Sequence, residues 1–176
     1  MILPILTAPD KRLKVRSDPV ARVDGDVRAL LDNMVATMRA APGIGLSAIQ
    51  VDVAKRIIVV EASDSDDQHD PSREVLHMVN PQIIWSSDEI ALCEEGCLSL
   101  PDQYADLERP AEVAVRFLDR EGKRRERKAA GVLARCIQHE MDHLDGILLV
   151  DRLSPLRRSM MLRKLTKLKK LQPAMV

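Results

Sequence analysis

The sequence predicts an α+β fold in which small antiparallel or mixed sheets pack around a central helix, with a further helix near each end of the chain. Apolar residues recur at helical spacing over 27–38 and 156–168. Short apolar runs bounded by turn residues lie between 56 and 129, which is typical of strands. The central helix begins at Gly131. At 176 residues the chain can bury a real core, and we expect one domain over 1–176.

The N-terminal helix follows an irregular segment that contains three prolines. Asp24 or Asp26 can cap this helix, and Pro42 and Gly43 are expected to end it. The next stretch, Gly43–Gln50, has two glycines two residues apart. Either a helix C-cap that turns into a strand or a close approach of the backbone to a ligand accounts for them. A dinucleotide-binding fingerprint would need a third glycine and a preceding strand, so we reject it.

Several short segments in the middle of the chain are predicted to be strands. The acidic stretch 61–73 is expected to be a solvated loop without a metal site, despite His69. Asn80-Pro81 is expected to end one strand, and the segment 119–123 is the turn of a hairpin. The predicted strands cover residues 56–60, 75–79, 83–85, 111–118 and 124–129.

The C-terminal part is expected to hold the central helix over about 131–145, a short extended segment over 147–150 and a last helix over 155–171. Residues 152–176 contain eight Lys or Arg and no Asp or Glu. Such a bias serves solubility or forms a surface for an acidic partner. The predicted apolar face of the last helix comprises Leu156, Met160, Leu162, Leu165 and Leu168.

Composition excludes several functional classes. The formal net charge is zero, so global charge does not favour nucleic acid, and three aromatic residues offer little for stacking on bases. Three cysteines are too few and odd in number for a disulfide framework, which favours a reducing compartment. The N-terminus lacks the basic region of a signal peptide, and no apolar run is long enough to span a membrane. We therefore expect a cytoplasmic protein.

The central helix carries the pattern His-Glu-x-x-His. The spacing of His139 and His143 puts both imidazoles on one face of a helix, one turn apart, as two ligands of one metal require. Glu140 lies at the edge of that face, within reach of a water on the metal. Imidazoles suit Zn²⁺, Fe²⁺, Ni²⁺ or Co²⁺. The bare pattern also arises by chance on amphipathic helices, so the rest of the chain must decide.

A catalytic site of this type needs a third protein ligand and one open position. No histidine follows the motif and the downstream acids are few, so the third ligand is expected upstream. Cys97, in a Gly-rich polar turn, is the best candidate, and Cys93 is the alternative. Cys136 lies on the motif helix, one turn before His139, and is expected to form a pocket wall instead.

Three stretches together resemble the signature motifs of the peptide deformylase family, in the same order. They are Gly43–Gln50, Glu95–Ser99 and Gln138–Leu144. The resemblance covers nearly the whole chain, and three motifs are far more specific than the histidine motif alone. Ser47 stands where the family usually has alanine, and we expect this small residue to be tolerated.

The resemblance implies hydrolysis of the N-formyl group of formyl-methionine at the start of nascent polypeptides, with release of formate. It implies one divalent metal ion, Fe²⁺ in the cell, with Zn²⁺, Ni²⁺ or Co²⁺ able to replace it. It implies Cys97, His139 and His143 as the metal ligands. Glu140 is then the general base and acid, while the Gln50 side chain and the Leu98 backbone N–H donate to the developing oxyanion.

The methionine side chain of such a substrate needs an apolar slot. By position, Ile44, Cys93, Val132 and Cys136 are candidates to line it, and the Gly45 backbone is a candidate to pair with the peptide. Core packing explains Val132 equally well.

Two other functions remain open at this point: a His-Glu-x-x-His endoprotease with an unrecognised third ligand, and a non-catalytic binding protein with the same fold. The basic helix over 155–171 adds the hypothesis that the protein meets ribosomal RNA near emerging chains.

Overall fold

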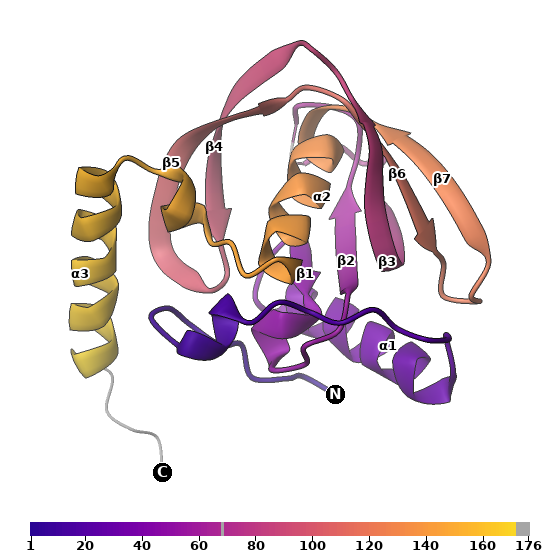
Figure 1. The fold of residues 1–176 in the computed structure, drawn as a ribbon, viewed down its shortest axis with the longest axis horizontal. Coiled ribbons are helices and arrows are strands. Elements are labelled where there is room, and N and C mark those ends of the chain that lie inside the picture. Colours follow the sequence, from indigo (N-terminus) through magenta and orange to yellow (C-terminus); the bar gives the residue numbers. More distant parts are fainter. Residues whose placement is uncertain (68, 172–176) are drawn as a thin grey trace.

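A computed structural model describes residues 1–67 and 69–171 and confirms the α+β fold. A central helix, α2 (Gly131–Leu144), lies between a five-stranded sheet and a separate two-stranded hairpin (Figure 1). Helix α1 (Gly25–Ala40) packs beside the first strands of the sheet, and helix α3 (Pro155–Leu171) lies beyond the hairpin. No helix within the described part of the chain is long and apolar enough to cross a membrane.

The larger sheet is antiparallel throughout, in the order β1-β2-β3-β6-β7. Its second strand is buried along almost its whole length, as the run of apolar residues predicts. The strands are β1 (Gly45–Ser47), β2 (Ile57–Ala62), β3 (Glu74–Ser86), β6 (Val113–Leu118) and β7 (Arg124–Ala129). The β6–β7 hairpin confirms the turn predicted at 119–123.

Strand β3 corrects one expectation, because it continues through Asn80-Pro81 instead of ending there. The register with β6 shifts between Val79 and Gln82, so the strand passes this point with an irregularity. Asn80 has a positive φ of 52°, a conformation that asparagine tolerates better than most residues. Its side-chain amide also exchanges two hydrogen bonds with the backbone of Val20, at 2.8 Å each, which anchors the N-terminal segment.

The hairpin of β4 (Ile90–Cys97) and β5 (Leu100–Pro110) is the largest element that sequence reasoning missed. The stretch around Cys97 was expected to be a polar turn, and it is instead the end of a long antiparallel ladder. Burial alternates along β5, with Ala105, Leu107 and Arg109 inside. Acidic residues at the outward positions between them hid the apolar alternation.

The structure confirms one predicted helix cap and corrects one predicted extended segment. The Asp24 side chain accepts a hydrogen bond from Val27 N–H at 3.1 Å, which confirms the predicted cap of α1. The expected extended segment over 147–150 is wrong, because Leu149–Arg152 forms a 3₁₀ turn. Its Asp151 carboxylate accepts the Leu148 N–H at 2.8 Å and draws the turn closed. Two other 3₁₀ turns span Lys11–Lys14 and Ala48–Val51.

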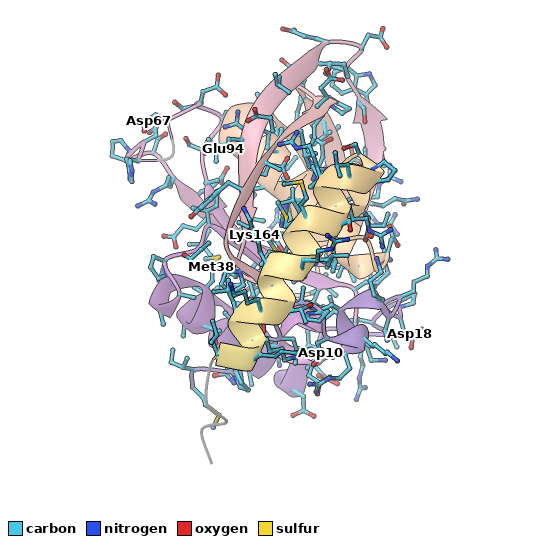
Figure 2. All side chains as sticks on the ribbon, turned by 90° about the vertical axis from the view of Figure 1, so that its left-hand side faces the viewer. Asp10, Asp18, Met38, Asp67, Glu94 and Lys164 are labelled. Carbon is cyan, nitrogen blue, oxygen red and sulfur yellow. The ribbon has the colours of Figure 1, made fainter. Side chains whose placement is uncertain are left out.

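Helix α3 has the predicted bounds, and its predicted apolar face is confirmed in part, because Leu165 is buried and Leu162 packs against the same core cluster. Met161 and Leu165 are its buried residues, whereas Leu156, Met160 and Leu168 are exposed. Within the described residues its main contacts are with β5 and the preceding 3₁₀ turn, next to which it lies in Figure 1. Figure 2 shows its outer surface, with Lys164 labelled.

Candidate metal centre and active site

Helix α2 and the end of β4 bring three potential metal ligands together. Atoms of Cys97, His139 and His143 lie within 4.8 Å of one another. The spacing of the two histidines on α2 aligns their rings on one face, with centroids 5.1 Å apart. Cys97 Sγ stands 3.2 Å from His143 Nε2. Of the upstream cysteines, the structure thus brings Cys97 to the histidines.

The residues present fit a divalent metal. Two ligand atoms of a tetrahedral site, about 2.1 and 2.3 Å from the ion, stand roughly 3.6 Å apart, close to the observed sulfur–nitrogen separation. Both imidazoles are at least 90% buried, and burial lowers the pKa of His143 well below its usual value, which favours the neutral ring that ligates a metal. A partly buried thiol and two buried imidazoles form a donor set suited to Zn²⁺, Fe²⁺, Ni²⁺ or Co²⁺.

A buried chain of charges holds His139 in place. Glu95 Oε2 lies 2.9 Å from His139 Nδ1, while Arg109 forms a two-pronged ion pair with the same carboxylate at 2.5 and 2.9 Å. Arg109 also donates to Asp142 at 3.0 Å, and Arg152 completes the chain on Asp142 at 2.6 Å. Because Glu95 accepts at Nδ1, the Nε2 atom of His139 is left to face the other candidate ligands.

The hydrogen bonds of Glu95 to His139 and Arg109 determine its pKa. Burial alone would raise the pKa of Glu95, but hydrogen bonds from His139 and Arg109 outweigh it and hold that pKa at about 2. The Arg109 side chain is only 4% exposed. A buried ion pair of this geometry is costly to break from one side, since the remaining charge loses its compensation. The pair therefore orients His139 and depends on both members.

Glu140 lies beside the candidate metal ligands without being one of them. It is 4% exposed, and its Oε2 has no hydrogen-bond partner within the described residues. Burial raises the pKa of Glu140 from 4.5 to about 7, near the value at which a carboxyl group both accepts and releases protons efficiently. The glycine at position 45 makes room for it, because a Cβ there would lie 2.5 Å from Glu140 Oε1 and 2.6 Å from Cys136 Sγ.

Gln50 approaches the site from the 3₁₀ turn that follows β1. Its Nε2 donates to Ser99 Oγ at 3.0 Å and lies 3.7 Å from Cys97 Sγ. Its Oε1 accepts from both the backbone N–H and the hydroxyl of Ser47, at 2.9 Å each. Gln50 is 1% exposed, so its carboxamide is a fixed donor beside the thiol of Cys97.

A cavity of about 640 Å³ opens onto these groups. Glu140 and His139 of the motif line it, as do Cys97 at the end of β4 and Leu98 in the turn that follows. Four of the residues expected from the sequence to meet a substrate also line it: Ile44, Gly45, Val132 and Cys136.

Cys93 is the exception among the expected pocket residues. It is absent from the cavity lining within the described chain, and its Sγ instead accepts from Arg135 at 2.6 Å. Cys136 is buried, and its thiol donates to the Ile44 carbonyl at 3.4 Å. Burial raises the pKa of Cys136 well above its usual value, which makes it an inert wall.

Several site residues were not identified from the sequence. Glu95 stands in a recognised motif, but nothing in the sequence gave it a partner. Arg109 and Asp142 carry no local signal, because their pairing depends on how β5 meets α2. Tyr104 also lines the cavity and covers Gly96, where a Cβ would lie 2.7 Å from the tyrosine ring.

This fold and site define a metal-dependent hydrolase: a partly buried thiol and two buried imidazoles lie beside a carboxylate that lines a cleft. Comparison with known proteins identifies the family within this class. A family model described as polypeptide deformylase matches residues 2–159. The chain belongs to this family.

Named relatives are similar in sequence to this chain over nearly its full length. A peptide deformylase of Pelagibacter ubique is 52% identical over 165 residues, covering 94% of each chain. One from Rhizobium meliloti is 46% identical over 173 residues, covering 98% of this chain and 97% of the relative. The crystal structure of peptide deformylase from Ehrlichia chaffeensis superimposes with a TM-score of 0.90 at 39% identity, covering 97% of this chain and 98% of that one. A second crystal structure of the Ehrlichia protein is a complex with actinonin, at a TM-score of 0.89.

Proposed function

We propose that this protein removes the N-formyl group from the formyl-methionine that begins nascent polypeptides, releasing formate and a free α-amine. Membership of the deformylase family supports this reaction. The observation that carries it is the cluster of Cys97, His139 and His143, next to a cavity that Cys97, His139 and Glu140 line. We propose that Cys97, His139 and His143 hold the metal.

Cys97, His139 and His143 would hold a divalent metal, which would supply an acidified water and polarise the formyl carbonyl. Glu140 takes the proton of the attacking water and delivers it to the leaving amine. Its Oε2 has no hydrogen-bond partner among the described residues, which leaves that oxygen available for these transfers. Gln50 Nε2 and the Leu98 backbone N–H donate to the oxygen that gains negative charge. One such donor contributes about 2.7–4 kcal/mol to barrier lowering, so Gln50→Ala is severe but milder than Glu140→Ala.

The substrate methionine side chain enters the cavity against Ile44, Val132 and Cys136. These residues line it from the end of β1 and from α2. Gly45 stands on an edge strand of the sheet, where backbone groups are available to an extended peptide. An apolar wall with few convergent polar groups is typical of a site that selects a side chain by shape.

We propose Fe²⁺ as the metal in the cell. The thiolate of Cys97 donates charge to the metal and exposes an iron centre to oxidation. The Zn²⁺, Ni²⁺ and Co²⁺ ions also suit this donor set.

We further propose that residues 1–176 act as one catalytic domain whose α3 meets the ribosome. Helix α3 presents exposed Lys and Arg side chains on a surface that the other described residues leave uncovered (Figure 2). Basic residues of this kind bind RNA phosphates. Because the proposed substrate emerges from ribosomes, we propose that the protein acts in the cytoplasm. Undiminished ribosome binding by a chain truncated at Pro155 would remove the α3 hypothesis.

The reaction is tested by turnover of formyl-Met-Ala-Ser, with Glu140→Ala as the control. Formate release that is lost in the variant supports deformylation. Cleavage of an internal peptide bond would instead identify an endoprotease, and no reaction at all would identify a non-catalytic relative. Leu98 acts through its backbone, so it is tested by substituting Pro for it, which removes the N–H.

A further inference from the structure

Ser47 has no part in the roles described so far, yet it sits at the centre of the site. It is fully buried at the end of β1. Its hydroxyl donates to Gln50 Oε1 at 2.9 Å, and it also acts on the Glu140 carboxylate, whose pKa it lowers against the effect of burial. A buried hydroxyl normally needs a partner, and this one is committed to the side chain that donates beside Cys97.

The Gln50 carboxamide has a single orientation that satisfies its neighbours. The Ser47 backbone N–H can only donate, so the oxygen of the carboxamide must face it. The Ser47 hydroxyl then fills the second lone pair of the same oxygen. On the other side, one Nε2 hydrogen goes to Ser99 Oγ, which leaves the second directed toward Cys97 Sγ.

We propose that Ser47 is a positioning residue: its hydroxyl fixes the Gln50 carboxamide and polarises it, so that the remaining Nε2–H is a stronger and better aimed donor. An amide whose oxygen accepts two hydrogen bonds donates more strongly through its nitrogen. Alanine at position 47 would keep the backbone bond and lose the hydroxyl bond. This inference rests on the oxyanion-donor role proposed for Gln50.

The test is a double-mutant cycle over Ser47→Ala and Gln50→Ala, with all proteins loaded with nickel and assayed on formyl-Met-Ala-Ser. Loss of one neutral hydrogen bond gives an expected fall in kcat of up to about tenfold for Ser47→Ala, with KM unchanged. In the Gln50→Ala background the same substitution should change kcat by less than about twofold, because its effect passes through Gln50. Equal falls in both backgrounds, or no fall in the wild-type background, would overturn the proposal.

Two controls separate positioning from packing. Ser63→Ala removes a hydroxyl from another buried serine, distant in sequence from the site, and should leave kcat unchanged. Metal content and the thermal midpoint are measured for every variant. Loss of metal from Ser47→Ala would place its effect in the metal site and refute the role proposed here.

A direct readout is the exchange of the Gln50 side-chain amide protons with water, followed by NMR in the zinc-loaded protein. The resonances are assigned by their absence in Gln50→Ala. Exchange should accelerate in Ser47→Ala, and unchanged exchange would overturn the proposal. If Gln50→Ala keeps full activity, the donor role of Gln50 and this inference both fail, while deformylation stands. If wild type releases no formate, the proposed reaction itself fails.

Discussion

Replacing Glu95 by glutamine removes one charge from the buried chain that ends on His139 and leaves the side-chain shape intact. Glu95 now accepts from both His139 and Arg109 with its two oxygens. Glutamine has only one oxygen, so its amide nitrogen must face either the His139 N–H or a guanidinium N–H. One donor in the pair is then left without an acceptor.

The magnitude follows from these contacts. Loss of a hydrogen-bond partner of a metal-ligating histidine typically weakens metal binding about 10–100-fold, or roughly 1.4–2.7 kcal/mol. Removing one partner of a buried ion pair costs about 3–5 kcal/mol. Arg109 keeps its bond to Asp142, so we expect the lower end, about 3 kcal/mol. For a chain of this size that lowers the thermal midpoint by roughly 6–12 °C.

Metal affinity is measured by competition with a chelator, and stability by thermal unfolding of the metal-free protein. Glu108→Gln is the matched control, because Glu108 precedes Arg109 on β5, is exposed and faces Leu92 across the hairpin. The control should match wild type in both measurements. Glu95→Gln with metal affinity within about twofold of wild type would refute the argument that Glu95 orients His139.

Three further predictions follow from other contacts. Gly45→Ala should lower kcat at least about tenfold, because its Cβ would push Glu140 and Cys136 apart; wild-type kinetics would contradict this. Burial alone would raise the pKa of Asp151, but hydrogen bonds from the Lys14 side chain and the Leu148 N–H outweigh it and lower that pKa. Its stabilisation, about 1–2 kcal/mol, is present above the unfolded pKa near 4 and is lost as pH falls. Urea unfolding should therefore separate Asp151→Asn from wild type at pH 7, and the difference should shrink as the pH falls below about 4. The iron-loaded enzyme should lose activity in air faster than the nickel-loaded form; equal half-lives would contradict that.

Local chemistry made much of the fold predictable. The Asp24 cap and Pro42 bracket α1, and the turn at 119–123 defines the β6–β7 hairpin, because these signals act within a few residues. The β4–β5 hairpin was hidden because its outward positions are acidic and its turn coincides with a motif. The face of α3 depends on how little of the hairpin it covers, which helical spacing does not encode.

Some residues of the candidate site could likewise be predicted from the sequence, and others could not. Residues within the three motifs, such as Cys97 and Glu140, were predictable because each carries chemistry at a recognisable spacing. Arg109 was not, since its pairing with Glu95 and Asp142 forms only when β5 lies against α2. Ser47 was expected to be a tolerated small residue, and its hydroxyl contact with Gln50 became visible only in three dimensions.

The central claim is that Glu140 transfers protons at a metal held by Cys97, His139 and His143. Its most direct test compares wild type with Glu140→Gln, both loaded with one equivalent of nickel and assayed for formate release from formyl-Met-Ala-Ser. The variant should bind one metal ion per chain as wild type does, with formate release reduced by a factor of at least about 100. Formate release at the wild-type rate by the metal-loaded variant would contradict the mechanism.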